Sequence, residues 1–122
     1  MNIGVIARVP FDEGSLTGTL TKDSRWPEGD WRNSYFVKEN LEASVDRAEE
    51  LKPLVPEESS LARMALRFCL SHPAVSTVIP GMRKPEHVRA NLAASDLGTL
   101  PPELLAQLKT HRWDRRPTEW SQ

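Results

Sequence analysis

The segment 78–91, VIPGMRKPEHVRAN, combines the residue types of an anion-binding site. A short apolar run ends there in a Pro-Gly turn, and Pro85 stands where the first turn of a helix favours proline. The first-turn amides of a helix are free donors, and the helix dipole makes that end positive. Arg83 lies just ahead and can donate two parallel hydrogen bonds to a phosphate. We therefore expect this segment to hold an anion such as a nucleotide phosphate.

Two further polar side chains belong to the same predicted helix. His87 and Asn91 are four residues apart, so they share one helix face. The alternative interpretation is a capped surface helix with solvated cations at Arg83 and Lys84, because Pro-Gly turns before helices are common. Spacing alone does not choose between the two.

Composition limits the class of protein. The chain has 122 residues, which suits one compact domain and is too short for a closed (β/α)₈ barrel of about 250 residues. Lys and Arg number 16 against 17 Asp and Glu, so the formal charge is −1. This balance argues against a broad electrostatic grip on DNA or on an anionic membrane. Partners are therefore expected to be neither nucleic acid nor membrane.

Cysteine usage and the apolar pattern indicate in which cellular compartment the protein is expected. Cys69 is the single cysteine, so an internal disulfide is excluded, and its place on an apolar helix side predicts a buried small hydrophobe rather than a nucleophile. No apolar run reaches the length of a membrane span, and no signal-peptide pattern opens the chain. We expect a cytoplasmic protein.

Hydrophobic periodicity predicts two strands and four helices. The strands are expected at 3–9 and 75–79, the helices at 40–52, 60–71, 85–95 and 102–110, a long loop at 10–38 and a tail at 111–122. The run 3–9 is almost continuously apolar, which is typical of a buried parallel strand. Asn40 is expected to cap its helix. Two such strands with helices between them predict an α/β fold with a parallel pair and a right-handed crossover.

Other chemistry-bearing residues have structural interpretations. Tyr35 is the only tyrosine, and with the clustered tryptophans it favours an ordered, packed loop over a disordered one. His72 is expected to cap a helix end rather than to bind a metal. The tail carries basic and indole side chains, which predict a solvated tail with anchoring indoles rather than a single-stranded nucleic-acid site: His111, Arg112, Arg115, Arg116, Trp113 and Trp120.

Three segments together resemble the aldo-keto reductases, which are NADP(H)-dependent (β/α)₈-barrel oxidoreductases. GVIARVPFDEGSLTG (4–18) is similar to the seventh strand and following loop of that family, and IPGMRKPEHVRANLAASD (79–96) to its eighth strand and next helix. LARMALRFCLSHPAVSTVIPG (61–81) is similar to the stretch between them. The resemblance covers about residues 3–110. It implies a single partial domain over 1–122, made of TIM-barrel-like βα units.

The resemblance also implies a cofactor site for NADP(H). The family binds the adenosine 2′-phosphate and adenine at positions that correspond here to Gly81, Met82, Arg83, His87 and Asn91. Arg83 would supply the charge and Asn91 an amide contact to adenine. The loop that starts at Phe11 would follow the pyrophosphate. Arg8 stands where the family commonly places an aromatic ring against the nicotinamide, and a guanidinium can also stack on planar rings.

The catalytic Asp, Tyr, Lys and His of the family come from earlier strands that this chain lacks, so no catalytic residue is assigned. Two parallel strands leave open edges that seek another strand. Three explanations stay open: self-association into a homo-oligomer, pairing with a complementary chain, and a chain that is a product of truncation or proteolysis. Three functions remain open: the cofactor-binding part of a reductase that is inactive alone, a non-enzymatic oligomerisation or interaction module, and one half of a split reductase completed in trans.

Overall fold

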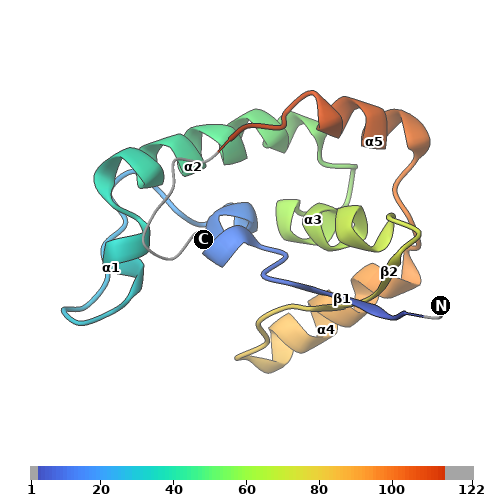
Figure 1. The fold of residues 1–122 in the computed structure, drawn as a ribbon, viewed down its shortest axis with the longest axis horizontal. Coiled ribbons are helices and arrows are strands. Elements are labelled where there is room, and N and C mark those ends of the chain that lie inside the picture. Colours follow the sequence, from blue (N-terminus) through green and yellow to red (C-terminus); the bar gives the residue numbers. More distant parts are fainter. Residues whose placement is uncertain (1–2, 115–122) are drawn as a thin grey trace.

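Two short parallel strands, β1 (Val5–Arg8) and β2 (Val75–Ile79), form the only sheet in the part of the chain that the structure describes, residues 3–114 of a computed structural model (Figure 1). The helices follow in chain order: η1 (Asp12–Thr17), α1 (Arg32–Tyr35), α2 (Lys38–Leu51), η2 (Lys52–Leu54), α3 (Leu61–Leu70), α4 (Pro85–Asp96) and α5 (Pro102–Lys109). The fold is α/β with a parallel pair, as the sequence predicts. β2 spans the same residues as the predicted strand.

The strand register aligns the carboxyl ends of β1 and β2. Arg8 pairs with Ile79 and Ala7 with Val78, and the register shifts by one residue just after Val5. The backbone N–H of Val5 there donates to the hydroxyl of Ser76 at 3.0 Å. Because both strands run in the same direction, a helical crossover must connect them, and α3 supplies the last part of it.

Helix α3 is the central element. It begins at Ser60, whose hydroxyl accepts the backbone N–H of Arg63 at 3.1 Å. Figure 1 shows α2 and α5 on one side of α3, with the strands and α4 on the other. The main core joins α2, α3 and the chain around α5, through buried Ala48, Leu61, Met64 and Leu100.

Arg67 of α3 holds the end of α4. Its guanidinium donates to three consecutive carbonyls, those of Leu97, Gly98 and Thr99, at 3.3, 2.9 and 2.8 Å. The hydroxyl of Ser71, at the end of α3, accepts the N–H of Leu100 at 2.8 Å. Carbonyls that follow a helix lack helical partners, so these contacts both satisfy them and fix α4 against α3.

Several sequence expectations need correction. The strand predicted over 3–9 is shorter and is not buried, since Ile3 and Ile6 are 73% and 62% exposed. Within residues 3–114, β1 has a neighbouring strand on one edge only, so its apolar side chains lack the contacts that their pattern anticipates. Asn40 does not cap α2: the helix begins at Lys38, and the buried Asn40 amide donates to the carbonyl of Tyr35 at 3.4 Å.

The remaining differences are small or lie at the chain ends. The loop predicted over 10–38 contains η1 and α1. The helix predicted over 60–71 is one residue longer than α3 at each end, and those predicted over 85–95 and 102–110 differ from α4 and α5 by one residue at the C-terminal end. Of the expected tail, Arg115, Arg116 and Trp120 lie outside the described residues. In residues 3–114, no helix combines the length and apolarity that a bilayer crossing requires.

We predict that Arg67→Met lowers the free energy of unfolding by about 2 kcal/mol, because hydrogen bonds from a charged donor contribute about 1.5–3 kcal/mol and this side chain is only half-buried. Urea unfolding followed by circular dichroism measures the change. Arg89→Met on exposed α4 is the matched control. Equal unfolding midpoints for the two variants would contradict the role assigned to Arg67.

Candidate functional site

The parallel pairing brings the carboxyl ends of β1 and β2 to one end of the sheet, where a cleft of about 380 Å³ opens. It is lined by Arg8, Val9, Pro10, Phe11, Glu13, Gly14, Ile79 and Gly81. Three of the site residues predicted from the sequence therefore come together here: Arg8, Phe11 and Gly81. In α/β barrels this is the end of the strands at which active sites are built.

The wall of the cleft that follows β1 has an unusual backbone. Asp12, Glu13 and Gly14 all have positive φ, at 49°, 56° and 110°. Positive φ is unfavourable for residues other than glycine, so this conformation persists only where surrounding contacts fix it. The turn places Glu13 in the lining of the same cleft as Arg8. Sequence analysis did not select Glu13, since no pattern in its neighbourhood marks it.

The carboxylate of Asp12 is fixed by two hydroxyl groups. Tyr35 donates to one of its oxygens at 3.2 Å, and Ser15 to the other at 2.6 Å. Ser15 is 3% exposed and Tyr35 is 9% exposed. Tyr35 therefore packs the long loop, the role expected for it, and in addition supports the wall of the cleft. The three-residue spacing of Asp12 and Ser15 was visible in the sequence, but the contact from Tyr35 spans 23 residues.

The loop that carries Tyr35 is ordered by aromatic and polar contacts. Trp26 stacks on Phe36 with ring centroids 5.3 Å apart, and Tyr35 meets Phe36 edge-on at 4.8 Å. The guanidinium of Arg32 lies 5.6 Å from the Trp26 ring centroid. These contacts join the loop to α2 through a small core that also contains Leu41.

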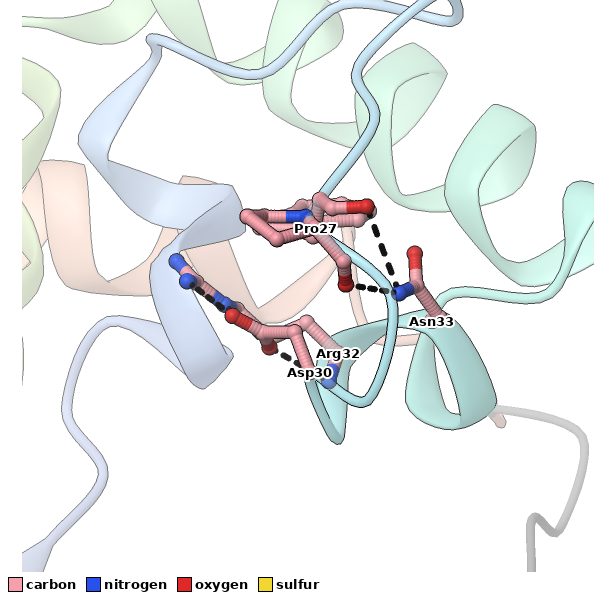
Figure 2. Close-up of polar contacts among 5 residues, drawn as sticks. Pro27, Asp30, Arg32 and Asn33 are labelled. Atoms are coloured by element: carbon pink, nitrogen blue, oxygen red, sulfur yellow. Dashed lines mark hydrogen bonds and ion pairs between the residues drawn. The ribbon is translucent and has the colours of Figure 1, made fainter.

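Polar contacts close the turn that precedes α1 (Figure 2). Asp30 accepts hydrogen bonds from Arg32 at Nε and at a terminal nitrogen, at 2.9 and 2.6 Å. Figure 2 also shows the side-chain amide of Asn33, which donates to the carbonyl of Pro27 at 2.9 Å. The hydrogen bonds from Arg32 lower the pKa of Asp30 to about 2.

The second group of predicted residues lies around the start of α4. Arg83 and His87 are exposed, and Arg83 forms no ion pair with another residue of the described chain. Lys84 lies 3.8 Å from the Glu86 carboxylate, which offsets part of its charge. Arg83 is therefore the cation at this helix end with its charge available to a ligand.

The main-chain donors at this helix end are fewer than the sequence suggested. Pro85 has no N–H, and the N–H groups of His87 and Val88 both donate to the carbonyl of Lys84, at 3.0 and 3.2 Å. Of the first-turn amides, only Glu86 is left without such a bond to Lys84. An anion would consequently depend on the Arg83 side chain more than on the helix amides.

Asn91 connects the two groups of residues. Its side-chain amide donates to the carbonyl of Gly81 at 3.3 Å, so this half-buried side chain holds the strand-end loop to α4. Asn91 and Met82, which is 46% exposed, line a second cavity of about 180 Å³ between α3, β2 and α4. The predicted site thus divides into the strand-end cleft and the α4 end, which meet at Gly81.

Two other residues take structural positions. Cys69 lines an apolar cavity of about 320 Å³ between β1, α3 and α5, and burial raises the pKa of its thiol. A raised pKa disfavours the nucleophilic thiolate. His72 follows α3, and its Nδ1 accepts the backbone N–H of Ala74 at 3.2 Å. In residues 3–114, no three His, Cys, Asp or Glu side chains are grouped so as to hold a metal ion.

The chain is similar to a known protein family and to several known proteins. The model of the aldo/keto reductase family matches residues 1–112. The chain is 32% identical, over 77% of its length, to the NADH-specific methylglyoxal reductase of Escherichia coli, and 30% identical, over 97% of its length, to an L-glyceraldehyde 3-phosphate reductase of the same species. It is also 30% identical, over 88% of its length, to a probable voltage-gated potassium channel subunit beta of rice.

A solved structure of an aldo-keto reductase also matches the chain. The holo form of aldo-keto reductase AKR11C1 from Bacillus halodurans superimposes on 98% of this chain with a TM-score of 0.61 and 25% sequence identity. The match covers 35% of that structure, and the three relatives above are covered over 30%, 36% and 34% of their lengths. The chain spans about a third of the proteins it matches.

We predict that the Asp30 carboxyl titrates near pH 2. Its pKa is lowered in the folded chain, so the stabilisation it provides is fully present above its ordinary value of 3.8 and is lost as the pH falls through about 2. Carbon-13 chemical shifts of the carboxyl group report the midpoint. Arg32→Gln should return the midpoint toward 3.8, and an unchanged midpoint in that variant would rule out Arg32 as the cause.

A second prediction concerns the wall of the cleft. Tyr35→Phe keeps the ring contacts and removes the hydroxyl donated to Asp12, so we expect the free energy of unfolding to fall by about 1 kcal/mol. Amide hydrogen exchange in residues 11–16 should accelerate in this variant. Ser34→Ala removes an exposed hydroxyl from α1 and should change neither quantity. Equal exchange rates in Tyr35→Phe and the parent chain would contradict the support we assign to Tyr35.

Proposed function

The chain belongs to the aldo/keto reductase family, and from this premise we propose that it is the NADP(H)-binding part of a reductase of that family and is inactive by itself. The observation that carries the proposal is the position of Arg83. It lies between the carboxyl end of β2 and Pro85, the first residue of α4, where it is exposed and forms no ion pair with a described residue. In α/β barrels, a phosphate site is frequently formed by the loops after the last two strands.

The residues present fit a nucleotide cofactor. A side-chain carbon added at Gly81 would meet no atom within 4 Å, so the main chain there is open to a ligand. The cleft beside it contains one cationic side chain and one aromatic ring, those of Arg8 and Phe11. An extended dinucleotide needs contacts of this kind at more than one point, and the α4 end supplies the separate cation at Arg83.

We assign the following roles to this chain's residues. Arg83 binds the adenosine 2′-phosphate through charge-assisted hydrogen bonds. Gly81 lets the ligand approach the backbone, while Phe11 and the turn after it form the wall along the pyrophosphate. Arg8 orients the nicotinamide end by stacking. When bound, the cofactor supplies the hydride for carbonyl reduction.

The roles of Asn91 and Glu13 differ from those implied by the family resemblance. The Asn91 amide is bonded to the carbonyl of Gly81, so we assign it the positioning of that loop before any contact with adenine. Glu13 lines the same cleft as Arg8, so these two opposite charges leave the cleft with no net positive charge for a phosphate. The phosphate that carries the most charge is therefore better placed at the α4 end than in the cleft.

The reaction needs a proton donor within hydrogen-bond reach of the substrate oxygen. Tyr35, the only tyrosine of the chain, donates its hydroxyl to Asp12 and is nearly buried. No residue of the described chain is assigned this role, which is why we propose that the isolated chain is inactive.

A second candidate function is a non-enzymatic interaction module. One of its relatives is named as a probable channel subunit, and β1 exposes apolar side chains such as Ile6. This candidate requires no cofactor, so every measurable property would be indifferent to Arg83→Ala.

Calorimetric titration with NADPH and NADH tests the first proposal. Arg83→Ala should weaken NADPH binding about tenfold, since a charge-assisted hydrogen bond contributes about 1.5 kcal/mol or more, and should leave NADH binding unchanged. Arg89→Ala, an exposed arginine farther along α4, is the matched control. The comparison with NADH matters because one relative is named as NADH-specific.

Two results would overturn the proposal. One is the absence of binding of either cofactor at millimolar concentration. The other is an equal effect of Arg83→Ala on the two cofactors, because a residue that meets the 2′-phosphate must discriminate between them.

A further inference from the structure

Arg8 is the cationic residue of the strand-end cleft. It is the last residue of β1 and pairs with Ile79 of β2, so it lies at the end of the sheet where the cleft opens. Arg8 is exposed, and it forms no ion pair with another residue of the segment 3–114. Its charge is therefore available to a ligand that enters the cleft.

The other charged residues near Arg8 come from the turn after β1 and from the chain after α5. Asp12 and Arg112, which have opposite charges, line with Arg8 the neighbouring cavity of about 320 Å³. His111 lines that cavity as well, and the Asp12 carboxylate is held there by two hydroxyl groups. Of the described residues, Glu13 is the charged one that shares the strand-end cleft with Arg8.

This distribution of charge determines which half of a dinucleotide meets Arg8. Arg8 and Glu13 balance each other in the cleft, whereas Arg83 is exposed near the start of α4 and forms no ion pair with a described residue. The phosphate with the most negative charge is therefore better placed at the α4 end. The nicotinamide at the other end then lies in the cleft, beside the planar guanidinium of Arg8 and the ring of Phe11.

The two redox forms of a nicotinamide differ in charge. The oxidised ring is a pyridinium cation, whereas the reduced ring is neutral and rich in electrons. A guanidinium over the face of a neutral, electron-rich ring is attracted to it. Two unit positive charges about 4 Å apart repel each other instead. A guanidinium that stacks on this ring therefore distinguishes the two forms, and an uncharged aromatic side chain at the same position lacks the repulsion.

We propose that Arg8 makes the strand-end cleft selective for the reduced cofactor, NADPH, over the oxidised one, NADP⁺. This inference rests on the proposed function, because it requires the nicotinamide to lie in the cleft. Its consequence is selective loading: the site takes up the reduced form when both are present, and the oxidised form dissociates more readily after the hydride has moved to a carbonyl carbon. The same selectivity makes hydride transfer on the protein less favourable by an equal factor.

Glu13 acts in the opposite direction. Its backbone has a φ of 56° in the turn after β1, and the residue lines the cleft, so its carboxylate attracts a cationic ring there. A stacked guanidinium contacts the ring itself, and charge interactions weaken with distance, so the effect of Arg8 is the larger of the two. Removing the charge of Glu13 should accordingly increase the preference for NADPH.

Calorimetric titration of the 122-residue chain with three ligands tests the proposal. They are NADPH, NADP⁺ and adenosine 2′,5′-bisphosphate, which has no nicotinamide. The chain should bind NADPH about five- to tenfold more tightly than NADP⁺, from the attraction to the neutral ring and the repulsion of the cationic one. The bisphosphate does not reach the cleft, so its affinity should be the same for the parent chain and for variants at Arg8.

Two substitutions at Arg8 separate its charge from its planar shape. Arg8→Tyr keeps a flat side chain without the charge, so the preference for NADPH should disappear. Arg8→Lys keeps the charge and should retain the preference. Glu13→Gln should increase it, and Arg83→Ala should weaken both redox forms by the same factor and leave their ratio unchanged. Arg8 is exposed, so circular dichroism should show its variants folded as the parent chain is.

Equal affinities of the parent chain for NADPH and NADP⁺ would overturn the proposal. A preference that Arg8→Tyr leaves intact would overturn it too, because the selectivity would then have another source. In both cases the cofactor still binds, and the proposed function stands. Absence of binding by all three ligands would instead overturn the proposed function, and the selectivity with it.

Discussion

The parallel pairing of β1 with β2 is the interaction on which the other features depend. It aligns the two carboxyl ends, so Arg8 lies opposite Ile79 and the turn at Phe11 faces the turn at Gly81. An antiparallel pair would place these turns at opposite ends of the sheet. The same pairing requires a crossover, and this brings α3 and its core against the strands. It also leaves the outer edge of β1 without a neighbouring strand in the described chain, where Ile3 and Ile6 are exposed.

Helix α4, which follows Arg83, is positioned by side-chain contacts to the chain before and after it. On the preceding side, Asn91 of α4 donates to the carbonyl of Gly81 and fixes the strand-end loop. At its other end, Arg67 binds three carbonyls that follow the helix, and Ser71 accepts the amide of Leu100. A small sheet provides little packing surface for a helix, so these polar contacts from α3 take over part of the positioning.

The features of the fold that could be predicted from the sequence are those caused by residues close together in the chain. β2 could be delimited because Val75 to Ile79 is a short run of mostly β-branched residues closed by a Pro-Gly turn. The start of α3 follows from Ser60, a local cap. The exposure of β1 agrees with the expectation that two parallel strands leave open edges, although its apolar pattern taken alone is typical of a buried strand. The capping role expected for Asn40 failed because its amide instead reaches back to the carbonyl of Tyr35.

The sequence supplied the candidate site as a list of positions and not as an arrangement. Spacing and resemblance selected Arg83, Gly81 and Phe11, but neither revealed that Pro85 and the carbonyl of Lys84 remove most helix amides from an anion. Nor did they reveal that Tyr35 fixes the strained turn of the cleft wall through Asp12. Under the proposed function, phosphate recognition would therefore rest on the Arg83 side chain more than on helix amides. It would also rest on the loop at 19–37, whose Tyr35 fixes the turn through Asp12.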